Sequence, residues 1–215
     1  MRAITVSSCN LNQWALDFVG NKERILEAVK KAKSDGSSLI ITPELSIPGY
    51  SCLDAFLEKD TTLHSWEVLK DLAEHDDCQG ILLDVGMPVM HRGCLYNCRV
   101  LVRNKKILYI RPKMSLANDG LFREMRYFTP WQGRGEGTDH ILPESLKELG
   151  DYGRVRFGDC VLETNDTKIG TEMCEELFTP DNPSTHLALD GVSSDSSLPP
   201  GPVLYYKTRA RRADS

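Results

Sequence analysis

Cys174 lies in the stretch "GTEMCEELFTP" (170–180), between Glu172 and the pair Glu175 and Glu176. A cysteine attacks as a thiolate, and neighbouring carboxylates should raise its pKa and make it less reactive. The stretch therefore leaves two interpretations open. Either Cys174 is a buried and inert thiol, which is the commoner state of a free cysteine, or a cation from elsewhere in the chain offsets these acids.

Three residues that could do chemistry end or follow predicted strands. Glu44 follows "LIITP", Lys113 ends "ILYIRPK" and Cys174 follows "KIGTEM". Side chains at the carboxyl ends of neighbouring strands converge on one crevice in an open α/β sheet. If these three converge, Glu44 takes the thiol proton, Cys174 attacks a carbonyl carbon, and Lys113 stabilises the thiolate and the oxyanion. Because a lone Glu–Lys pair is usually a surface contact, the pattern alone does not decide between the two interpretations.

The order of the elements that must position these residues indicates a mixed α/β domain built of packed layers. Helices are predicted where apolar residues recur at helical spacing, and strands where short apolar runs are bounded by turn residues. The predicted elements are a strand at 3–9, a helix at 21–36, a strand at 38–42, a helix at 63–73, a strand at 80–89, a hairpin at 95–113, a short helix near 143–148 and a second hairpin at 160–173. A loop-rich stretch covers 114–141.

Composition excludes several classes of function. The 215 residues are 40% hydrophobic and 27% charged, which is ordinary for a globular domain with a proper core. The net charge of −5 argues against broad contact with nucleic acid or a membrane surface. With no secretion signal and no long apolar run, we expect a cytoplasmic location with seven reduced cysteines. Cys94 and Cys98 have no second pair at zinc-finger spacing, so no metal site is predicted.

Several long motifs resemble those of a known family. "PELSIPGY", "RPKMSLANDG", "REMRYFTPW" and "IGTEMCEELFTP" resemble the nitrilase (carbon–nitrogen hydrolase) superfamily and its Glu-Lys-Cys triad. Between about Cys9 and Val192 the chain is similar, segment for segment, to the glutaminase domains of glutamine-dependent synthetases within that superfamily. The resemblance implies a nitrilase-like α-β-β-α sandwich.

The resemblance also implies roles for particular residues. Glu44 matches the general base, Lys113 the lysine beside the oxyanion hole, and Cys174 the nucleophile that forms a glutamyl thioester. The backbone N–H of Glu175 matches a second oxyanion donor, and its side chain matches the group that binds the α-amino group of glutamine. One of the acids beside Cys174 is then offset by the substrate itself.

Two further residues are assigned with qualifications. Glu124 matches a second glutamate that orients the lysine and the attacking water, and its simpler interpretation is a carboxylate at a helix start. Where relatives often carry "NYRE", this chain has "LFRE" at 121–124. Phe122 therefore keeps an aromatic ring for substrate binding but lacks the hydroxyl.

The chain departs from the family after Val192. Residues 193–215 are rich in Ser and Pro and carry four basic and two acidic side chains. Such a composition is typical of a disordered tail, and a basic anchor for RNA or a membrane is the alternative. We therefore expect a hydrolase domain at 1–192, a divergent tail at 193–215, and a sandwich that is incomplete at its C-terminal end.

The implied activity is hydrolysis of glutamine to supply ammonia to a synthetase domain. We expect no cofactor in this chain, because ATP and Mg²⁺ would belong to a synthetase domain absent from it, and we expect a homo-oligomer as in the full-length family. Two alternatives stay open: another nitrilase-type ω-amidase, or a non-catalytic isoform that binds full-length synthetase. The five histidines show no triad spacing and are expected to be surface or packing residues.

Overall fold

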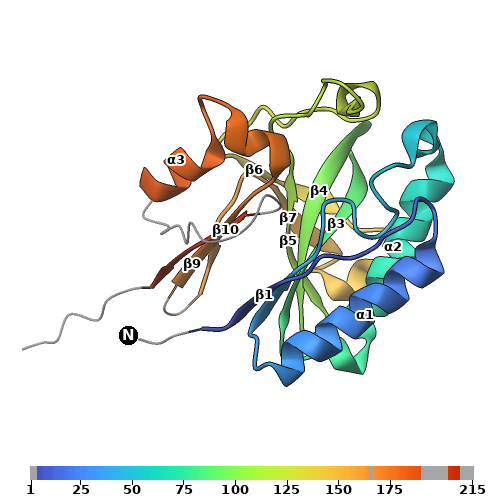
Figure 1. The fold of residues 1–215 in the computed structure, drawn as a ribbon, viewed down its shortest axis with the longest axis vertical. Coiled ribbons are helices and arrows are strands. Elements are labelled where there is room, and N and C mark those ends of the chain that lie inside the picture. Colours follow the sequence, from blue (N-terminus) through green and yellow to red (C-terminus); the bar gives the residue numbers. More distant parts are fainter. Residues whose placement is uncertain (1–3, 165–166, 190–202, 209–215) are drawn as a thin grey trace, which may run out of the picture.

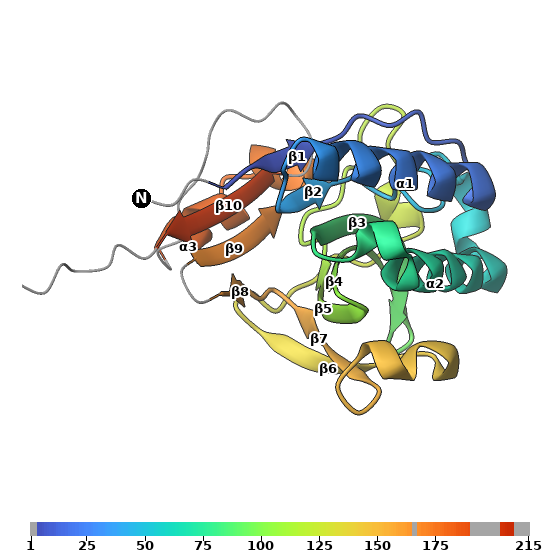
Figure 2. The same ribbon diagram turned by 90° about the horizontal axis from the view of Figure 1, so that it is seen from below.

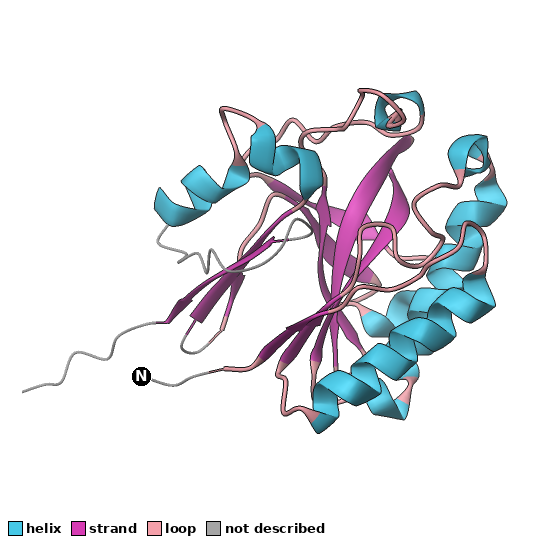
Figure 3. Ribbon diagram, in the orientation of Figure 1, coloured by secondary structure: helices cyan, strands magenta, loops and turns pink. Residues whose placement is uncertain are grey.

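The computed structural model describes residues 4–164, 167–189 and 203–208 of the chain. These residues form four layers (Figures 1 and 3). Helices α1 (Phe18–Ser34) and α2 (Lys59–Glu74) cover one face of a seven-stranded sheet, and a three-stranded sheet lies against the other face. Helix α3 (Pro183–Leu189) lies on the far side of the smaller sheet. The predicted α-β-β-α sandwich is therefore confirmed.

The larger sheet contains, in sheet order, β1 (Val6–Ser8), β2 (Leu39–Ile41), β3 (Leu82–His91), β4 (Cys94–Arg103), β5 (Lys106–Pro112), β7 (Arg154–Gly158) and β6 (Gly137–Ile141). β1, β2 and β3 run parallel, while β3, β4 and β5 form an antiparallel meander. Consequently β2 and β5 both end at the same end of the sheet. β7 is parallel to β5 and antiparallel to β6.

The smaller sheet is antiparallel and contains, in order, β10 (Val203–Thr208), β9 (Thr167–Glu172) and β8 (Leu162–Glu163). Short 3₁₀ turns connect the elements: η1 (Leu53–Leu57), η2 (Asp76–Cys78), η3 (Glu124–Arg126), η4 (Glu144–Leu149) and η5 (Cys174–Phe178). Two of these turns, η3 and η5, begin at predicted site residues.

Helix α1 follows from local chemistry. The side chain of Asp17 accepts a hydrogen bond from the N–H of Gly20, which caps the first turn, so the helix begins three residues before the predicted range. Lys31 lies in the last turn, where a cation is favourable to the helix dipole. Ile25 and Val29 recur on one face and are fully buried against the larger sheet.

A second apolar core joins the two sheets, whose opposed positions are visible from below in Figure 2. It contains Leu39, Ile41, Leu82, Leu101, Tyr109 and Ile169. Because side chains alternate along a strand, Arg99 on β4 and Arg111 on β5 point to the same face as this core, where they lie opposite each other in the register. The face toward the smaller sheet is thus apolar at one end and charged at the end where β5 leads into Lys113.

Two glycines allow close approaches that a side chain would block. A Cβ at Gly86 of β3 would meet the backbone N of Leu45 at 2.3 Å, so glycine lets the segment that carries Glu44 lie directly on the sheet. A Cβ at Gly170 of β9 would meet the side chain of Leu187 at 2.6 Å, so glycine lets α3 pack on the smaller sheet.

The structure contains elements that the sequence did not indicate. Strand β6 lies inside the stretch predicted as loop, and β7 and α3 were not predicted at all. Residues 203–208 of the predicted tail form strand β10, whose backbone pairs with β9. The turn at 165–166, the boundary at 192 and the rest of the tail lie outside the described residues, where the predicted disorder stays a prediction.

Candidate active site

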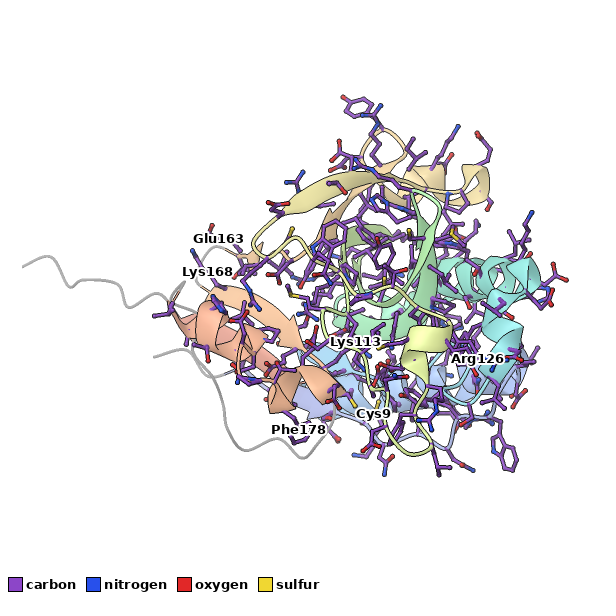
Figure 4. The ribbon with its side chains drawn as sticks, turned by 90° about the horizontal axis from the view of Figure 1, so that it is seen from above. Cys9, Lys113, Arg126, Glu163, Lys168 and Phe178 are labelled. Carbon is purple, nitrogen blue, oxygen red and sulfur yellow. The ribbon has the colours of Figure 1, made fainter. Side chains whose placement is uncertain are left out.

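The loop after β2 and the end of β5 bring Glu44 and Lys113 together. Nζ of Lys113 donates to Oε1 of Glu44 at 2.6 Å and to the Oε2 and Oε1 atoms of Glu124 at 2.8 and 3.0 Å. Lys113 is fully buried, and it is labelled near the centre of the view in Figure 4, which looks down on this end of the sandwich. The structure therefore places three of the predicted site residues in one cluster.

Glu44 is held by a tight turn against β3. Leu45, the next residue, has a φ of 50°, a left-handed conformation that is uncommon for a residue with a side chain. The hydroxyl of Ser46 bonds to Thr42 at 2.7 Å and accepts from the N–H of Gly86 at 3.2 Å. These bonds tie both ends of the turn to the sheet and aim the Glu44 carboxylate at Lys113.

Glu124 begins η3, so its simpler interpretation as a carboxylate at a helix start also holds. Besides Lys113, its carboxylate accepts hydrogen bonds from the N–H of Ala117 at 2.8 Å and from the hydroxyl of Tyr50 at 2.9 Å. It is almost fully buried. A buried carboxylate with this many donors holds its orientation, and both of its oxygens accept from the ammonium of Lys113.

Two residues of this network were not predicted. Nδ2 of Asn97 donates to Oε1 of Glu44 at 2.6 Å and to Oε1 of Glu124 at 3.3 Å, so it bridges the two carboxylates. Asn97 lies in the middle of β4, where asparagine is disfavoured, and this was the available sequence signal. Tyr50 ends the family motif "PELSIPGY", which was the available signal for it, although no role was assigned to it.

Cys174 occupies the first position of η5, directly after β9 and Met173. Its φ is 49°, so the nucleophile candidate sits on a strained elbow in the left-handed region. Its side chain is only partly buried. The backbone N–H of Glu175 lies beside the thiol and acts to lower its pKa.

The groups around Cys174 determine whether its thiol is ionised. Burial and then the Glu44 carboxylate raise the pKa of Cys174 to about 11, although Lys113 lowers it. Lys113 is thus the predicted cation, but it does not outweigh burial and the carboxylates. The thiol is therefore protonated at neutral pH and requires a base for attack.

Glu44 is suited to be that base. Burial raises its pKa to about 6, with Lys113 lowering it and Glu124 raising it. Burial acts to lower the pKa of Lys113, but the carboxylates of Glu44 and Glu124 outweigh it and raise that pKa above its usual value. At neutral pH the cluster therefore holds an ionised carboxylate and a charged ammonium beside a neutral thiol.

The acids beside Cys174 differ in their surroundings. Glu172 and Glu176 are fully buried, and Glu176 forms an ion pair with Arg111. Glu175 is half-buried, and among the described residues its carboxylate has no ion pair. The predicted role of Glu175 in substrate binding stays a prediction.

Phe122 lines a small pocket of about 60 Å³ beside the cluster, together with Tyr50 and Glu124. Its ring is 50% exposed and meets the ring of Tyr50 edge-on, with centroids 5.9 Å apart. Phe122 therefore lies beside Tyr50 and Glu124, at the carboxylate side of the cluster.

The histidines and the possible metal ligands do not form a second site in the described residues. His91 and His140 are buried packing residues, as predicted, whose Nδ1 atoms lie 3.0 Å apart. Within the part of the chain that the structure describes, no cluster of three or more His, Cys, Asp or Glu side chains is arranged to hold a metal ion. None of the helices in that part is long and apolar enough to span a bilayer.

The sequence matches the carbon–nitrogen hydrolase family over residues 5–195. The chain therefore belongs to the carbon–nitrogen hydrolases, and its four-layer fold agrees with that class. Its relatives include the glutamine-dependent NAD(+) synthetases of Saccharomyces cerevisiae, 53% identical over 189 residues, and of Homo sapiens, 52% identical over 191 residues. These matches cover 88% and 89% of this chain but 26% and 27% of the relatives. The chain thus spans about a quarter of their length and is homologous to their hydrolase part.

Solved structures agree with this assignment. The crystal structure of a glutamine-dependent NAD(+) synthetase from Cytophaga hutchinsonii matches with a TM-score of 0.71 and 31% identity, over 80% of this chain and 28% of that one. An amidase from Nesterenkonia sp. matches with a TM-score of 0.52 and 19% identity, over 63% of this chain and 50% of that one. At that level of identity, the amidase supports the fold alone.

Proposed function

We propose that this chain carries a glutaminase site in which Cys174 is the nucleophile, Glu44 the general base and Lys113 the cation beside the oxyanion. The observation that carries the proposal is the buried contact of Glu44 with Lys113, at the sandwich end to which β9 delivers a protonated thiol. Homology to the hydrolase part of glutamine-dependent NAD(+) synthetases supports glutamine as the substrate.

The steps follow from the protonation states. Glu44 takes the proton of Cys174 as sulfur bonds to the amide carbon, and the carbonyl oxygen becomes an oxyanion. Lys113 and the backbone N–H of Glu175 stabilise that oxyanion. The protonated Glu44 gives its proton to the leaving nitrogen, so ammonia departs and a thioester remains. Water then loses a proton to Glu44 and attacks the thioester, which releases glutamate and returns the proton to the sulfur.

Two further side chains bind the substrate in this proposal. Glu175 pairs with the α-amino group of glutamine, which supplies the counter-charge that its carboxylate lacks in the described residues. Phe122 offers an apolar surface at the edge of the pocket beside Glu124. Glu124 orients Lys113 and, in the second half of the reaction, the attacking water.

We further propose that the ammonia serves a synthetase domain that amidates nicotinate adenine dinucleotide to NAD. The names of the relatives and the quarter of their length that this chain spans support this. ATP and Mg²⁺ would be bound by that domain and not by this chain. We also propose a homo-oligomer and a cytoplasmic location, the latter supported by seven cysteines that are all free thiols.

The test is a glutaminase assay on the 215-residue protein. Purified chain is incubated with glutamine and with a panel of other ω-amides, and ammonia and the free acid are measured. We expect glutamine to be hydrolysed in preference to the other amides. Cys174→Ala should lose this activity. Cys52→Ala, which changes a buried thiol outside the cluster, should keep it.

Other outcomes identify the alternatives. Faster hydrolysis of a different amide would make the protein another ω-amidase. No hydrolysis of any amide, combined with co-purification of the chain with a full-length synthetase, would make it a non-catalytic partner. Either result would contradict the proposed activity.

A further inference from the structure

A buried carboxylate links the two predicted site residues that come from different sheets. Glu176 lies two residues after Cys174, is fully buried, and accepts hydrogen bonds from Nη1 of Arg111 at 2.9 and 2.6 Å. Arg111 lies on β5, two residues before Lys113, and is itself buried. The ion pair therefore joins the smaller sheet, which leads to the thiol, to the strand that leads to the lysine.

The same carboxylate also holds the backbone on both sides. Its Oε1 atom accepts from the N–H of Met114 at 2.6 Å, and its Oε2 atom accepts from the N–H of Met173 at 2.8 Å. Met114 directly follows Lys113, and Met173 directly precedes Cys174. One side chain thus fixes both residues that flank the candidate machinery.

This arrangement bears on the strained elbow at Cys174. A residue with a side chain is strained in the left-handed region, and it keeps that conformation only where its surroundings hold it there. Glu176 supplies that constraint, because its carboxylate satisfies the N–H immediately before the elbow while the ion pair fixes the carboxylate. Pairing with Arg111 also neutralises one of the acids beside the thiol, and the charges that act on the thiol are those of Glu44, Lys113 and Glu124.

We propose that Glu176 and Arg111 are positioning residues that hold the elbow of Cys174 at a fixed place relative to Lys113 and Glu44. This positioning affects catalysis only if Cys174 is the nucleophile, so the inference rests on the proposed function. A buried ion pair that serves stability alone can often be replaced by uncharged residues at little cost. Glu176 differs because two backbone N–H groups depend on its two oxygens, and a glutamine offers a single acceptor oxygen.

The test measures the reactivity of each cysteine in the 215-residue protein. Alkylation by iodoacetamide is followed against pH with peptide-resolved mass spectrometry in wild type, Glu176→Gln and the charge-balanced double variant Arg111→Met with Glu176→Gln. The peptide of Cys98, a fully buried thiol, reports unfolding in the same samples. Labelling by a diazoketone analogue of glutamine measures whether the thiol is still placed for attack.

In both variants we expect Cys174 to leave its partly buried position beside Glu44, so that its pKa falls toward the ordinary value. Iodoacetamide should then react about tenfold faster near neutral pH, since a lower pKa increases the thiolate fraction more than it reduces nucleophilicity. Labelling by the diazoketone should fall in the same samples, while Cys98 stays protected. Opposite changes in the two reagents are not expected from a loss of stability.

Two controls keep the outcome decisive. Val100→Ala removes buried volume from the core on the helix side and shows what lower stability alone does to Cys174. If Glu176→Gln exposes Cys98, the comparison moves to Arg111→Lys, which keeps the charge and should show a smaller change of the same sign. Alkylation and labelling of Cys174 at wild-type rates in folded variants would overturn the proposal.

The experiments distinguish a failure of the positioning role from a failure of the proposed glutaminase function. If wild-type protein hydrolyses no glutamine but the reactivity of Cys174 depends on Glu176, the glutaminase proposal fails and the positioning role stands. If glutamine is hydrolysed and the variants keep the wild-type reactivity and kcat, the positioning role fails alone.

Discussion

A hydrogen bond of 2.6 Å joins Nζ of Lys113 to Oε1 of Glu44, two residues that lie 69 positions apart in the chain. The contact couples their protonation, because the carboxylate favours the ammonium and the ammonium opposes the rise in the carboxylate's pKa. The two residues do not form a surface ion pair, since the side chain of Lys113 is fully buried and that of Glu44 is only 10% exposed.

This coupling predicts the pH dependence of the proposed glutaminase. Glu44 acts as a base only when ionised, and its pKa is raised to about 6. The value of kcat/KM should therefore rise with pH through about 6 and level off above about 7. A pH profile of glutamine hydrolysis measures this, and Glu44→Gln should abolish the activity. A rise centred near pH 4.5, the ordinary value for a glutamate, would show that a different group is the base.

Asn97 gives a prediction about the same base. Asn97→Asp would place a third carboxylate 2.6 Å from Glu44, and a nearby like charge raises the pKa of a carboxyl group. We expect the acidic limb of the pH profile to move up by about one unit and kcat to fall. Asn104→Asp, in the exposed turn between β4 and β5, is the matched control and should leave the profile unchanged. An unmoved limb in Asn97→Asp would mean that the bridge does not control Glu44.

The sequence could predict that Glu44, Lys113 and Cys174 converge because strand ends are visible in apolar patterns, and the family motif around Glu124 added that residue. It could not predict the bridge by Asn97 or the bonds of Glu176, because these depend on which strands become neighbours. Although β4 follows β3 and precedes β5 in the chain as it does in the sheet, nothing local in "LYNC" records that the Asn97 amide reaches Glu44 and Glu124. Strands β6 and β7 were missed for a similar reason. Both strands are short and partly exposed, and β7 pairs with the edge of β5.

Tyr50 should affect the chemical step more than substrate binding. Its hydroxyl donates to Glu124 at 2.9 Å, and burial followed by the Glu124 charge raises the pKa of Tyr50, so it stays a donor. Tyr50→Phe keeps the ring contact with Phe122 and removes one hydrogen bond, worth about 0.5–1.5 kcal/mol, so kcat should fall about two- to tenfold. Steady-state kinetics measure this. Tyr127→Phe, in the same pocket, should keep the wild-type kcat, and an equal fall in both variants would indicate a packing effect.

Glu175 should affect KM instead. Glu175→Gln removes the proposed partner of the substrate's α-amino group but keeps the backbone N–H that faces the thiol. Loss of a hydrogen bond to a charged group costs about 1.5–3 kcal/mol, so the KM for glutamine should rise about tenfold or more while kcat changes little. Glu163→Gln, on β8 and well away from Lys113 in Figure 4, serves as the control. An unchanged KM in Glu175→Gln would limit Glu175 to its backbone role.

The buried pair of His91 and His140 predicts how stability changes with pH. Burial and the neighbouring His91 lower the pKa of His140 to about 4, and burial followed by Arg92 lowers that of His91. Both rings are therefore neutral in the folded protein at pH 7, stacked against Phe157, with His140 also against Trp66.

The sign follows from proton binding. An unfolded histidine has a pKa of about 6.5, so between about pH 6.5 and 4 the unfolded chain binds more protons than the folded protein and stability falls as the pH falls. For His140 alone the loss from pH 7 to 5 should be about 2 kcal/mol. His140→Phe keeps an aromatic ring in the stack and removes this titration, so the free energy of unfolding in urea should fall less between these two pH values than in wild type. His64→Phe, which changes a histidine outside the buried pair, should keep the wild-type slope. An identical pH dependence in His140→Phe and wild type would show that the pair titrates normally in the folded state.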